Sequence, residues 1–467
     1  MMQSQFDIVI VGAGPAGMSA AIEAAKHGAT VCLLDEQQRA GGQIYRNVAQ
    51  TKPAQAKILG KDYLAGGHLV QELGQSAVDH RAGVTVWNVG EDGAVTYSRD
   101  ERAGQVHGQH VIIANGATER PVPIPGWTLP GVITAGAAQI MMKSDGLVAQ
   151  NAVLVGSGPL LYLVATQLLA AGAPPKALVE TQTRQNLMSA LPHFLGAVKD
   201  WKQLGKGMRF LLALKRAKVP RYTAASEIAV EGTDHAQAVT FRAGGTEHRI
   251  ETDMVLLHQG VVPNTQISRS LKLDHRFDDI QRCFHPVIDA LGQSSHPLFS
   301  LEGDGAGIGA AQVAALSGRL AALNALAAVG QIDAAVRDTQ AAGLIKARRS
   351  ELSIRPFLDV LYTPPEEVFA PADDTIICRC EEVRAGDIRK FAAMGCDGPN
   401  RTKVFSRCGM GPCQGRNCGL TVTEILAAEH KRSQNEIGAF RMRAPLKPVT
   451  LSELSALSDT IHQDKTQ

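Results

Sequence analysis

The sequence is poor in several features that mark particular classes of protein. Aromatic residues make up 4% of its 467 residues, and the formal net charge is +2. A nucleic-acid-binding module needs stacking side chains and a strongly basic surface, so neither value favours one. No apolar run has the length of a transmembrane helix, and the N-terminus lacks the basic and long apolar regions of a signal peptide. We therefore expect a soluble, cytoplasmic protein with reduced thiols, no nucleic-acid partner and no transmembrane segment.

Glycine and apolar residues, in contrast, are abundant. The chain has 46 glycines and is 45% hydrophobic, a balance that suits α/β folds with buried sheets and tight turns. Its length exceeds that of one ordinary domain, so we expect two or three.

Cysteine is unevenly distributed. Two of the eight cysteines, Cys32 and Cys283, are isolated, and we expect both to be structural. The other six lie in one short segment: Cys378, Cys380, Cys396, Cys408, Cys413 and Cys418. Close pairs of cysteines suit thiolate ligation of a metal centre. The alternatives are structural zinc, disulfides and unused thiols. We favour an iron–sulfur cluster over zinc, because zinc sites usually carry C-x2-C pairs and this segment has none.

The N-terminal residues carry a dinucleotide-binding pattern. A β-branched apolar strand is expected at 6–11, followed by the turn Gly12-Ala-Gly14-Pro15-Ala16-Gly17, a helix and a second strand that ends at Asp35 and Glu36. In such a unit the first glycine makes the turn and the second admits the pyrophosphate. The third allows close helix packing, and the acid accepts hydrogen bonds from the ribose. The helix N-terminus favours the phosphate charge.

A second unit of this kind is expected further along the chain. A strand at 151–155 leads into Gly156-Ser-Gly158-Pro-Leu-Leu161, a helix, and a strand that ends at Glu180. Leu161 replaces the third glycine, which crowds the contact between helix and strand. The unit is therefore either an NAD(P)H site, a retained fold that is empty, or a site for another adenine nucleotide.

Three further segments resemble the fingerprints of two-dinucleotide-binding flavoproteins. They are the Gly41-Gly42-Gln43 loop, the strand and turn at 111–118 with Ala114 and Gly116, and residues 298–305 with Gly303 and Asp304. The resemblance implies FAD, with Asp304 at the ribitol and the following helix pointing at the flavin ring. Asp304 can also serve as a helix N-cap. Disulfide reductases of this superfamily carry a redox pair of cysteines soon after the first unit or inside the second. The corresponding ranges here, 41–47 and 119–282, have no cysteine, so a disulfide reductase is not favoured.

The C-terminal motifs resemble one family more closely. Cys378-Arg-Cys380-Glu-Glu-Val, Gly409-Met-Gly-Pro-Cys413-Gln-Gly-Arg416 and 355–362 are similar to the FAD- and iron–sulfur-containing alpha-type subunits of hydrogen cyanide synthase, opine oxidase and D-hydroxyproline dehydrogenase. The cysteine segment resembles a bacterioferritin-associated ferredoxin, which implies a [2Fe–2S] cluster held by four cysteines. On that pattern the interval from Cys380 favours Cys413 over Cys408, so the predicted ligands are Cys378, Cys380, Cys413 and Cys418.

The resulting fold class is α/β, with five expected parts. An FAD-binding domain covers 1–118 and 266–345, an NAD(P)-domain-like insert 119–265, a linker on the flavin domain 346–372, a small helical [2Fe–2S] domain 373–430, and a tail 431–467. Within the second unit, residues 184–221 are rich in Lys and Arg and predict a helical insert. It is either a contact surface for a partner protein or a solvated hairpin.

The resemblance implies that the chain is one component of a multi-subunit dehydrogenase or oxidase for a small amino or imino acid. An amino-acid-oxidase-like partner would be its catalytic subunit. Two further implications are a small third subunit, and a second flavin, FMN, at a subunit interface. Flavins split electron pairs and [2Fe–2S] clusters carry single electrons, so the two cofactors suit each other. Two alternatives remain: a self-sufficient NAD(P)H-dependent reductase, and a redox sensor whose cluster controls a partner.

Overall fold

The computed structural model describes residues 4–464. Its N-terminal unit is built on a seven-stranded sheet in the order β3-β2-β1-β6-β5-β4, with β19 paired to β6. The strands are β1 (Gln5–Val11), β2 (Val31–Asp35), β3 (Asp79–Ala82), β4 (Thr85–Val89), β5 (Ala94–Arg99), β6 (Arg102–Ile113) and β19 (Phe299–Leu301). β1, β2, β3, β6 and β19 are parallel, and β4 and β5 extend β6 as an antiparallel meander.

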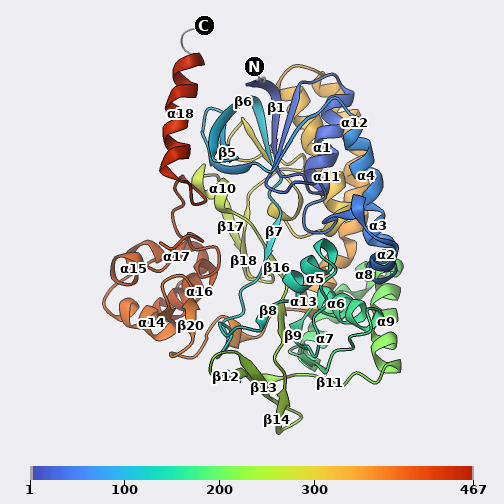
Figure 1. Cartoon of the computed structure of the whole chain (residues 1–467), viewed down its shortest axis with the longest axis vertical. Helices are drawn as coiled ribbons and strands as arrows, with labels where there is room; N and C mark the ends of the chain where they lie inside the picture. Colours follow the sequence, from blue (N-terminus) through green and yellow to red (C-terminus); the bar gives the residue numbers. More distant parts are fainter. Residues whose placement is uncertain (1–3, 465–467) are drawn as a thin grey trace.

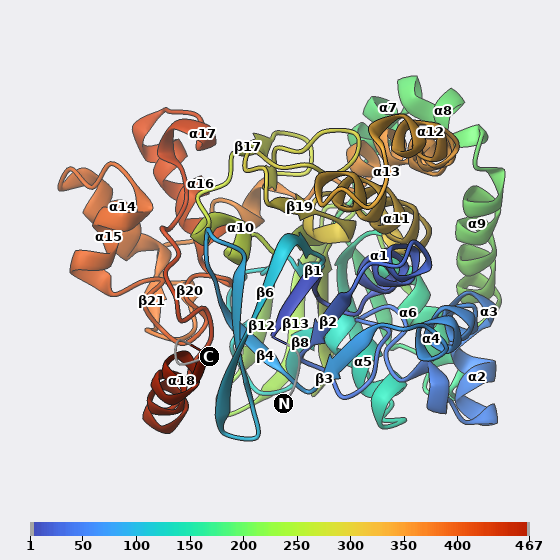
Figure 2. The same cartoon turned by 90° about the horizontal axis from the view of Figure 1, so that it is seen from above.

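Helices cover the parallel part of this sheet (Figures 1 and 2). α1 (Pro15–Lys26) packs on α11 (Ala310–Ala328), and α12 (Ala334–Glu351) packs on α11. The short helices α2 (Pro53–Leu59), α3 (Lys61–Leu64) and α4 (Gly66–Gly74) lie beyond α1. β1 and β2 are buried almost throughout, as their continuous apolar runs require of strands covered on both faces.

The second unit has a five-stranded parallel sheet in the order β11-β10-β9-β15-β8. Its strands are β8 (Val132–Thr134), β9 (Val153–Ser157), β10 (Ala177–Glu180), β11 (Arg221–Tyr222) and β15 (Val255–Gln259). α5 (Ala135–Ser144) and α6 (Pro159–Ala170) pack on it, and β12 (Ser226–Gly232), β13 (Ala236–Ala243) and β14 (Thr246–Glu251) form a separate antiparallel sheet. The two units are joined by the antiparallel pair β7 (Ala117–Glu119) and β16 (Val261–Pro263).

The insert at 184–221 is helical, as predicted. It contains α7 (Arg184–Ala190), α8 (Phe194–Val198) and α9 (Trp201–Arg216). The expected linker, 346–372, contains helix: α12 extends into it as far as Glu351, and α13 (Arg355–Leu361) follows. Asp359 of α13 accepts a hydrogen bond from the Gln281 side chain, within the expected flavin domain, at 3.0 Å. α13 also packs against α7 and α8. The reason is a small apolar core shared by Ala190, Ala197, Ile354 and Phe357.

The cysteine region lies beside both units (Figure 1). It comprises β20 (Ile376–Cys378), β21 (Val383–Arg384), α14 (Ala385–Ala393), α15 (Pro399–Ser406), α16 (Gly419–His430) and α17 (Gln434–Ile437), around its own core. Between the first unit and this region run α10 (Gln266–Ser270), β17 (His275–Asp278) and β18 (Cys283–Pro286). The tail returns to the first sheet, where α18 (Leu451–Asp464) lies along β6. None of the described helices is both long and apolar enough to span a membrane.

Candidate functional site

A cavity of about 320 Å³ opens where β1, β2 and β6 end. The predicted dinucleotide-binding residues converge on it from five separate stretches of the chain. Those that line it are Gly12, Gly14, Pro15, Ala16, Asp35, Glu36, Gly42, Gln43, Ala114, Gly116, Gly303 and Asp304. Gly17 does not line the cavity but lies behind it, at the contact between α1 and β1.

The glycines around this cavity form a cradle with an open centre. A Cβ on Gly17 would lie 1.8 Å from the Gly12 carbonyl oxygen, and a Cβ on Gly12 would lie 2.4 Å from that of Ala114, so both positions require glycine. At Gly14 the nearest atom, the Gly42 Cα, is 3.9 Å from a Cβ. The space above Gly14, at the N-terminus of α1, thus suits a pyrophosphate, which the helix dipole and free N–H groups favour.

Asp35 and Glu36 have different surroundings at the end of β2. The Asp35 carboxylate is buried and accepts hydrogen bonds from the N–H groups of Ala13 and Gln37, at 2.5 and 2.6 Å. Burial raises the pKa of Asp35. One of its oxygens therefore braces the glycine turn, and the other holds the chain just after β2. The Glu36 side chain is half exposed and lines the same end of the cavity. Lys447 pairs with only one of its carboxylate oxygens, so the carboxylate is better placed than that of Asp35 to accept from a ribose.

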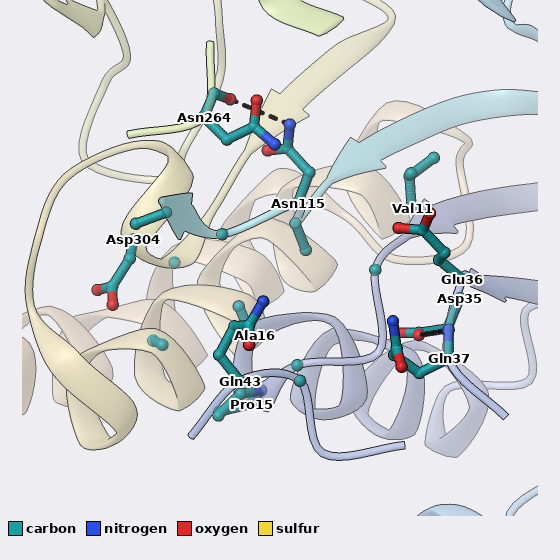
Figure 3. A pocket seen from close by; sticks show the side chains of 18 of the residues that line it. Val11, Pro15, Ala16, Asp35, Glu36, Gln37, Gln43, Asn115, Asn264 and Asp304 are labelled. Atoms are coloured by element: carbon teal, nitrogen blue, oxygen red, sulfur yellow. Dashed lines mark hydrogen bonds between the residues drawn. The ribbon is translucent and has the colours of Figure 1, made fainter. Parts of the chain in front are cut away.

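Asp304 lies at the opposite end of the cavity (Figure 3). One of its carboxylate oxygens accepts the N–H groups of Gly309 and Ala310, at 2.9 and 3.0 Å. It therefore caps the start of α11. The cap holds the helix N-terminus towards the cavity, which the residues Ala310 and Ala311 also line. The two ends match an elongated ligand with a ribose at Glu36 and a polyol at Asp304.

Several lining residues were not among the predicted ones. Asn115 and Asn264 are joined by a hydrogen bond from the Asn115 amide to the Asn264 carbonyl, at 3.0 Å (Figure 3). Arg416, Leu446 and Lys447 reach the cavity from the C-terminal part of the chain. Arg416 belongs to the Cys413-Gln-Gly-Arg416 motif, but no local pattern connects the other two with a nucleotide.

The cysteine segment folds into one cluster. The sulfur atoms of Cys378, Cys408 and Cys418 lie within 4.8 Å of one another, and all three residues are buried. Hydrogen bonds from the other two thiols lower the pKa of Cys378 to about 2, whereas the pKa values of Cys408 and Cys418 are raised. Three converging buried thiols fit a soft, thiolate-bound metal centre.

The predicted ligand set overlaps this group in part. Cys380 and Cys413 form a neighbouring pair linked by a side-chain hydrogen bond; Cys380 is exposed and Cys413 half-buried. A Cβ on Gly411 would lie 2.3 Å from the Cys380 Cβ, so the loop passes close to that residue. The structure thus adds Cys408 to the candidate ligands, although its distance in sequence from Cys380 had favoured Cys413. Cys396 is not part of the thiol trio formed by Cys378, Cys408 and Cys418.

The cavity adjoins the loop that carries Cys413 and Cys418. The Gln266 side chain lines the cavity and donates to the Cys413 carbonyl at 3.1 Å. Arg416 lines this cavity and also a smaller one between α10, β18 and the loop that carries the cysteines. The two candidate sites are therefore direct neighbours in the fold.

In the second unit, the acid of the fingerprint is already engaged. Glu180 is fully buried, and an Arg221 side-chain N–H group is 2.9 Å from both of its carboxylate oxygens. Leu161 is fully buried against the same sheet. With its acid paired to arginine, this unit lacks the free ribose acceptor of a dinucleotide site.

Cys32 and Cys283 are buried and not paired in a disulfide. Burial raises the pKa of each thiol to about 12, so both are protonated and unreactive at neutral pH. Neither supplies the dithiol of a disulfide reductase.

Comparisons with known proteins agree with this arrangement. The family model described as pyridine nucleotide-disulphide oxidoreductase matches residues 6–318, and the sarcosine oxidase A3 domain matches 373–458. The A-type subunit of opine oxidase from Agrobacterium tumefaciens (strain Ach5) is 42% identical over 97% of this chain and 92% of its own length. The chain belongs to the opine oxidase family of A-type subunits, among the pyridine nucleotide-disulphide oxidoreductases.

Other members and neighbours extend the picture. The HcnB component of hydrogen cyanide synthase from Pseudomonas protegens is 32% identical over 97% of this chain and 98% of its own. The alpha chain of sarcosine oxidase from Corynebacterium sp. (strain P-1) is 24% identical, and the match covers 45% of that longer protein. The structure of L-proline dehydrogenase from P. horikoshii superposes with a TM-score of 0.68 at 18% identity, over 97% of this chain and 80% of that one.

Membership of the opine oxidase family confirms the predicted family and the α/β, Rossmann-type flavoprotein fold. It also places the chain among flavin-dependent oxidoreductases. The domain boundaries and the individual site residues remain predictions.

Proposed function

We propose that this chain is the FAD- and [2Fe–2S]-binding component of a hetero-oligomeric enzyme that oxidises a C–N bond of a small amino or imino acid. The substrate is of the opine or sarcosine type, as the names of two relatives suggest, or of the glycine or D-hydroxyproline type, as the resemblance of the C-terminal motifs implies. The observation that carries the proposal is the hydrogen bond from Gln266, in the wall of the dinucleotide cavity, to the Cys413 carbonyl in the cysteine loop.

In this proposal the chain's own residues have distinct tasks. The glycine cradle and the N-terminus of α1 bind the pyrophosphate, Glu36 accepts from the adenosine ribose, and Asp304 holds α11 towards the flavin end. Cys378 and Cys418 are metal ligands, joined by Cys380 and by Cys413 or Cys408. When bound, FAD accepts a hydride equivalent and a [2Fe–2S] cluster accepts one electron at a time.

A catalytic partner of the amino-acid-oxidase type is part of the proposal, as the names of the relatives suggest. The α7–α9 insert offers a contact surface for it. Large apolar side chains are exposed there, among them Met188, Leu195 and Trp201 at 69%, 81% and 69%. Clustered exposed apolar residues mark interaction surfaces.

Native purification with co-eluting partners tests the proposal. The isolated chain should contain FAD, iron and sulfide, give an EPR signal when reduced, and turn over little amino acid until the partner is added. Full turnover by the purified chain alone would refute its role as one component of a larger enzyme. Anaerobic bleaching of the flavin by NADH would instead favour a self-sufficient reductase, against which the Glu180–Arg221 pair argues. Dehydrogenase activity that survives loss of the cluster, while partner binding changes, would favour the redox sensor.

A further inference from the structure

The segment 440–447 connects the cysteine region to the first unit. Phe440 is buried in the core of the cysteine region, and Leu446 is buried in the core of the first sheet. Met442, between them, packs against both cores. The Leu446 N–H group donates to the Trp87 carbonyl in β4 at 2.7 Å. The segment is therefore anchored at both ends and bridges the two parts.

The anchored segment also forms part of the cavity wall. Leu446 and Lys447 line the cavity together with Glu36, at the end opposite Asp304, where Asp35, Glu36 and Gln37 gather (Figure 3). The Lys447 ammonium group forms an ion pair with the Glu36 carboxylate. The adenosine end of the cavity is thus closed by residues that lie far beyond the fingerprint in the sequence.

Arg416 is the second C-terminal cation in this wall. It is half-buried, lines the cavity, and its guanidinium group has no hydrogen-bond or ion-pair partner among the described residues. Gln414, two residues before it, donates a side-chain hydrogen bond to the Pro445 carbonyl. The cysteine loop and the segment 440–447 are thereby fixed to each other on the same side of the cavity.

We propose that the cysteine loop and the segment 440–447 form a strap that closes over a bound adenine dinucleotide, with Arg416 and Lys447 as binding residues. Arg416 pairs with the pyrophosphate, since that is the ionised group of oxidised FAD and Arg416 is a cation without a partner among the described residues. Lys447 holds the strap shut through Glu36 and adds a donor beside the adenosine ribose. The inference rests on FAD as the ligand of this cavity.

This closure makes the two candidate sites interdependent. The dinucleotide can leave only when Arg416 and Lys447 release it, and Arg416 belongs to the loop that carries Cys413 and Cys418. A folded, metal-loaded cysteine region therefore strengthens binding of the dinucleotide, and by linkage the bound dinucleotide strengthens binding of the metal by the same factor.

The test is the rate of FAD release from the holoprotein, followed as the rise in flavin fluorescence on dilution. Lys447→Ala and Arg416→Ala should each release FAD about tenfold faster or more, since contact losses act mainly on the dissociation rate. Removal of the iron with a chelator, followed by reoxidation of the flavin so that released FAD is fluorescent, should speed release from the wild type similarly. Arg443→Ala is the matched control, because Arg443 is an exposed cation of the same segment that does not line the cavity.

The outcomes separate the two ideas. A wild-type chain that binds no FAD would overturn the proposed function. Wild-type binding with unchanged release from both Lys447→Ala and Arg416→Ala would overturn the strap while leaving that function intact. Circular dichroism and iron content identify any variant that has lost its fold, and Lys447, whose side chain reaches the surface, can be replaced without opening a core.

Discussion

The Gln266 side chain donates to the Cys413 carbonyl oxygen at 3.1 Å. Gln266 is 6% exposed and begins α10, whereas Cys413 stands in the loop before α16. The same amide lies 3.9 Å from the Met442 sulfur, so one residue contacts both the cysteine loop and the segment 440–447. It is one of the contacts that connect the wall of the dinucleotide cavity with the cysteine region.

Replacing Gln266 with alanine should loosen this contact. The change removes one buried hydrogen bond and leaves the Cys413 carbonyl without that donor, at a cost of about 1 kcal/mol in the free energy of unfolding. Iron should also be lost faster to a chelator. Urea titration and a chelation time course check both effects. Gln331→Ala, at an exposed position, should change neither, and equal behaviour of the two variants would argue against a bridging role for Gln266.

Gly17 tests the close packing behind the cavity. A Cβ there would lie 1.8 Å from the Gly12 carbonyl oxygen, and backbone cannot yield as a flexible side chain would. Gly17→Ala should destabilise the fold by about 1–3 kcal/mol and lower the FAD content of the purified protein. Gly67→Ala, in α4 with no heavy atom within 4 Å of its Cβ, should be neutral or stabilising by about 0.5–1 kcal/mol. Thermal unfolding and flavin absorbance are the measurements.

The first unit can be predicted well from the sequence because the residues that define it are close together in the chain. Strand, glycine turn, helix and acid follow one another directly, and each position has a single physical task. The residues that close the cavity are a different case. Lys447 meets Glu36 only because the tail crosses from one core to another, and no pattern around Lys447 encodes that crossing. Arg416 stood inside a recognised motif, but nothing local showed that it faces a nucleotide cavity.

The cysteines show a second limit. Spacing favours Cys413 because it counts only the residues between two cysteines and ignores how the chain between them folds. In the fold, Cys408 lies beside the buried Cys378 and Cys418. The expected linker at 346–372 shows a related limit. Ile354 and Phe357 form an apolar core with α7 and α8, and tertiary contacts of this kind leave no periodic signal in so short a segment.

Serine variants of the cysteines should divide them by role. Cys378→Ser and Cys418→Ser should abolish the cluster, since both residues belong to the predicted set and to the thiol trio. Cys396→Ser should keep full iron and sulfide. The variants Cys408→Ser and Cys413→Ser then identify the fourth ligand. Loss of the cluster only in Cys413→Ser supports the assignment from spacing. Loss of the cluster only in Cys408→Ser supports the assignment from the geometry of the three buried thiols. Iron and sulfide analysis with EPR of the reduced protein provides the readout.

Lys143 predicts a pH dependence of stability. Its buried ammonium group donates to the Gln43 carbonyl at 3.1 Å and to the Gln139 side chain at 2.8 Å, and burial lowers its pKa from 10.5 to about 7. Between these values the unfolded chain binds more protons than the folded one at this residue. Folding stability contributed by Lys143 therefore rises with pH from about 7 to 10.5, with a slope of at most about 1.4 kcal/mol per pH unit.

Comparison with Lys143→Met isolates this contribution. The wild type should gain free energy of unfolding relative to the variant as the pH is raised from about 7 to about 9. Lys346→Met, at an exposed position of α12, should keep a constant difference from the wild type over the same range. Urea titrations at several pH values across that range measure both differences. If the difference between the wild type and Lys143→Met does not change with pH, Lys143 titrates normally.

The Glu180–Arg221 pair predicts how the second unit responds to a single substitution. Arg221→Ala leaves a fully buried carboxylate without its partner, which costs about 3–5 kcal/mol when such a pair is broken. The double variant Arg221→Ala/Glu180→Gln removes the charge as well and should recover much of that loss. Urea titration gives the energies. If Glu180 is held for structure, as its pairing indicates, NADH should neither protect the wild type against unfolding nor bleach its flavin. A shift of the wild-type unfolding midpoint with NADH would instead show that Glu180 exchanges Arg221 for a ribose.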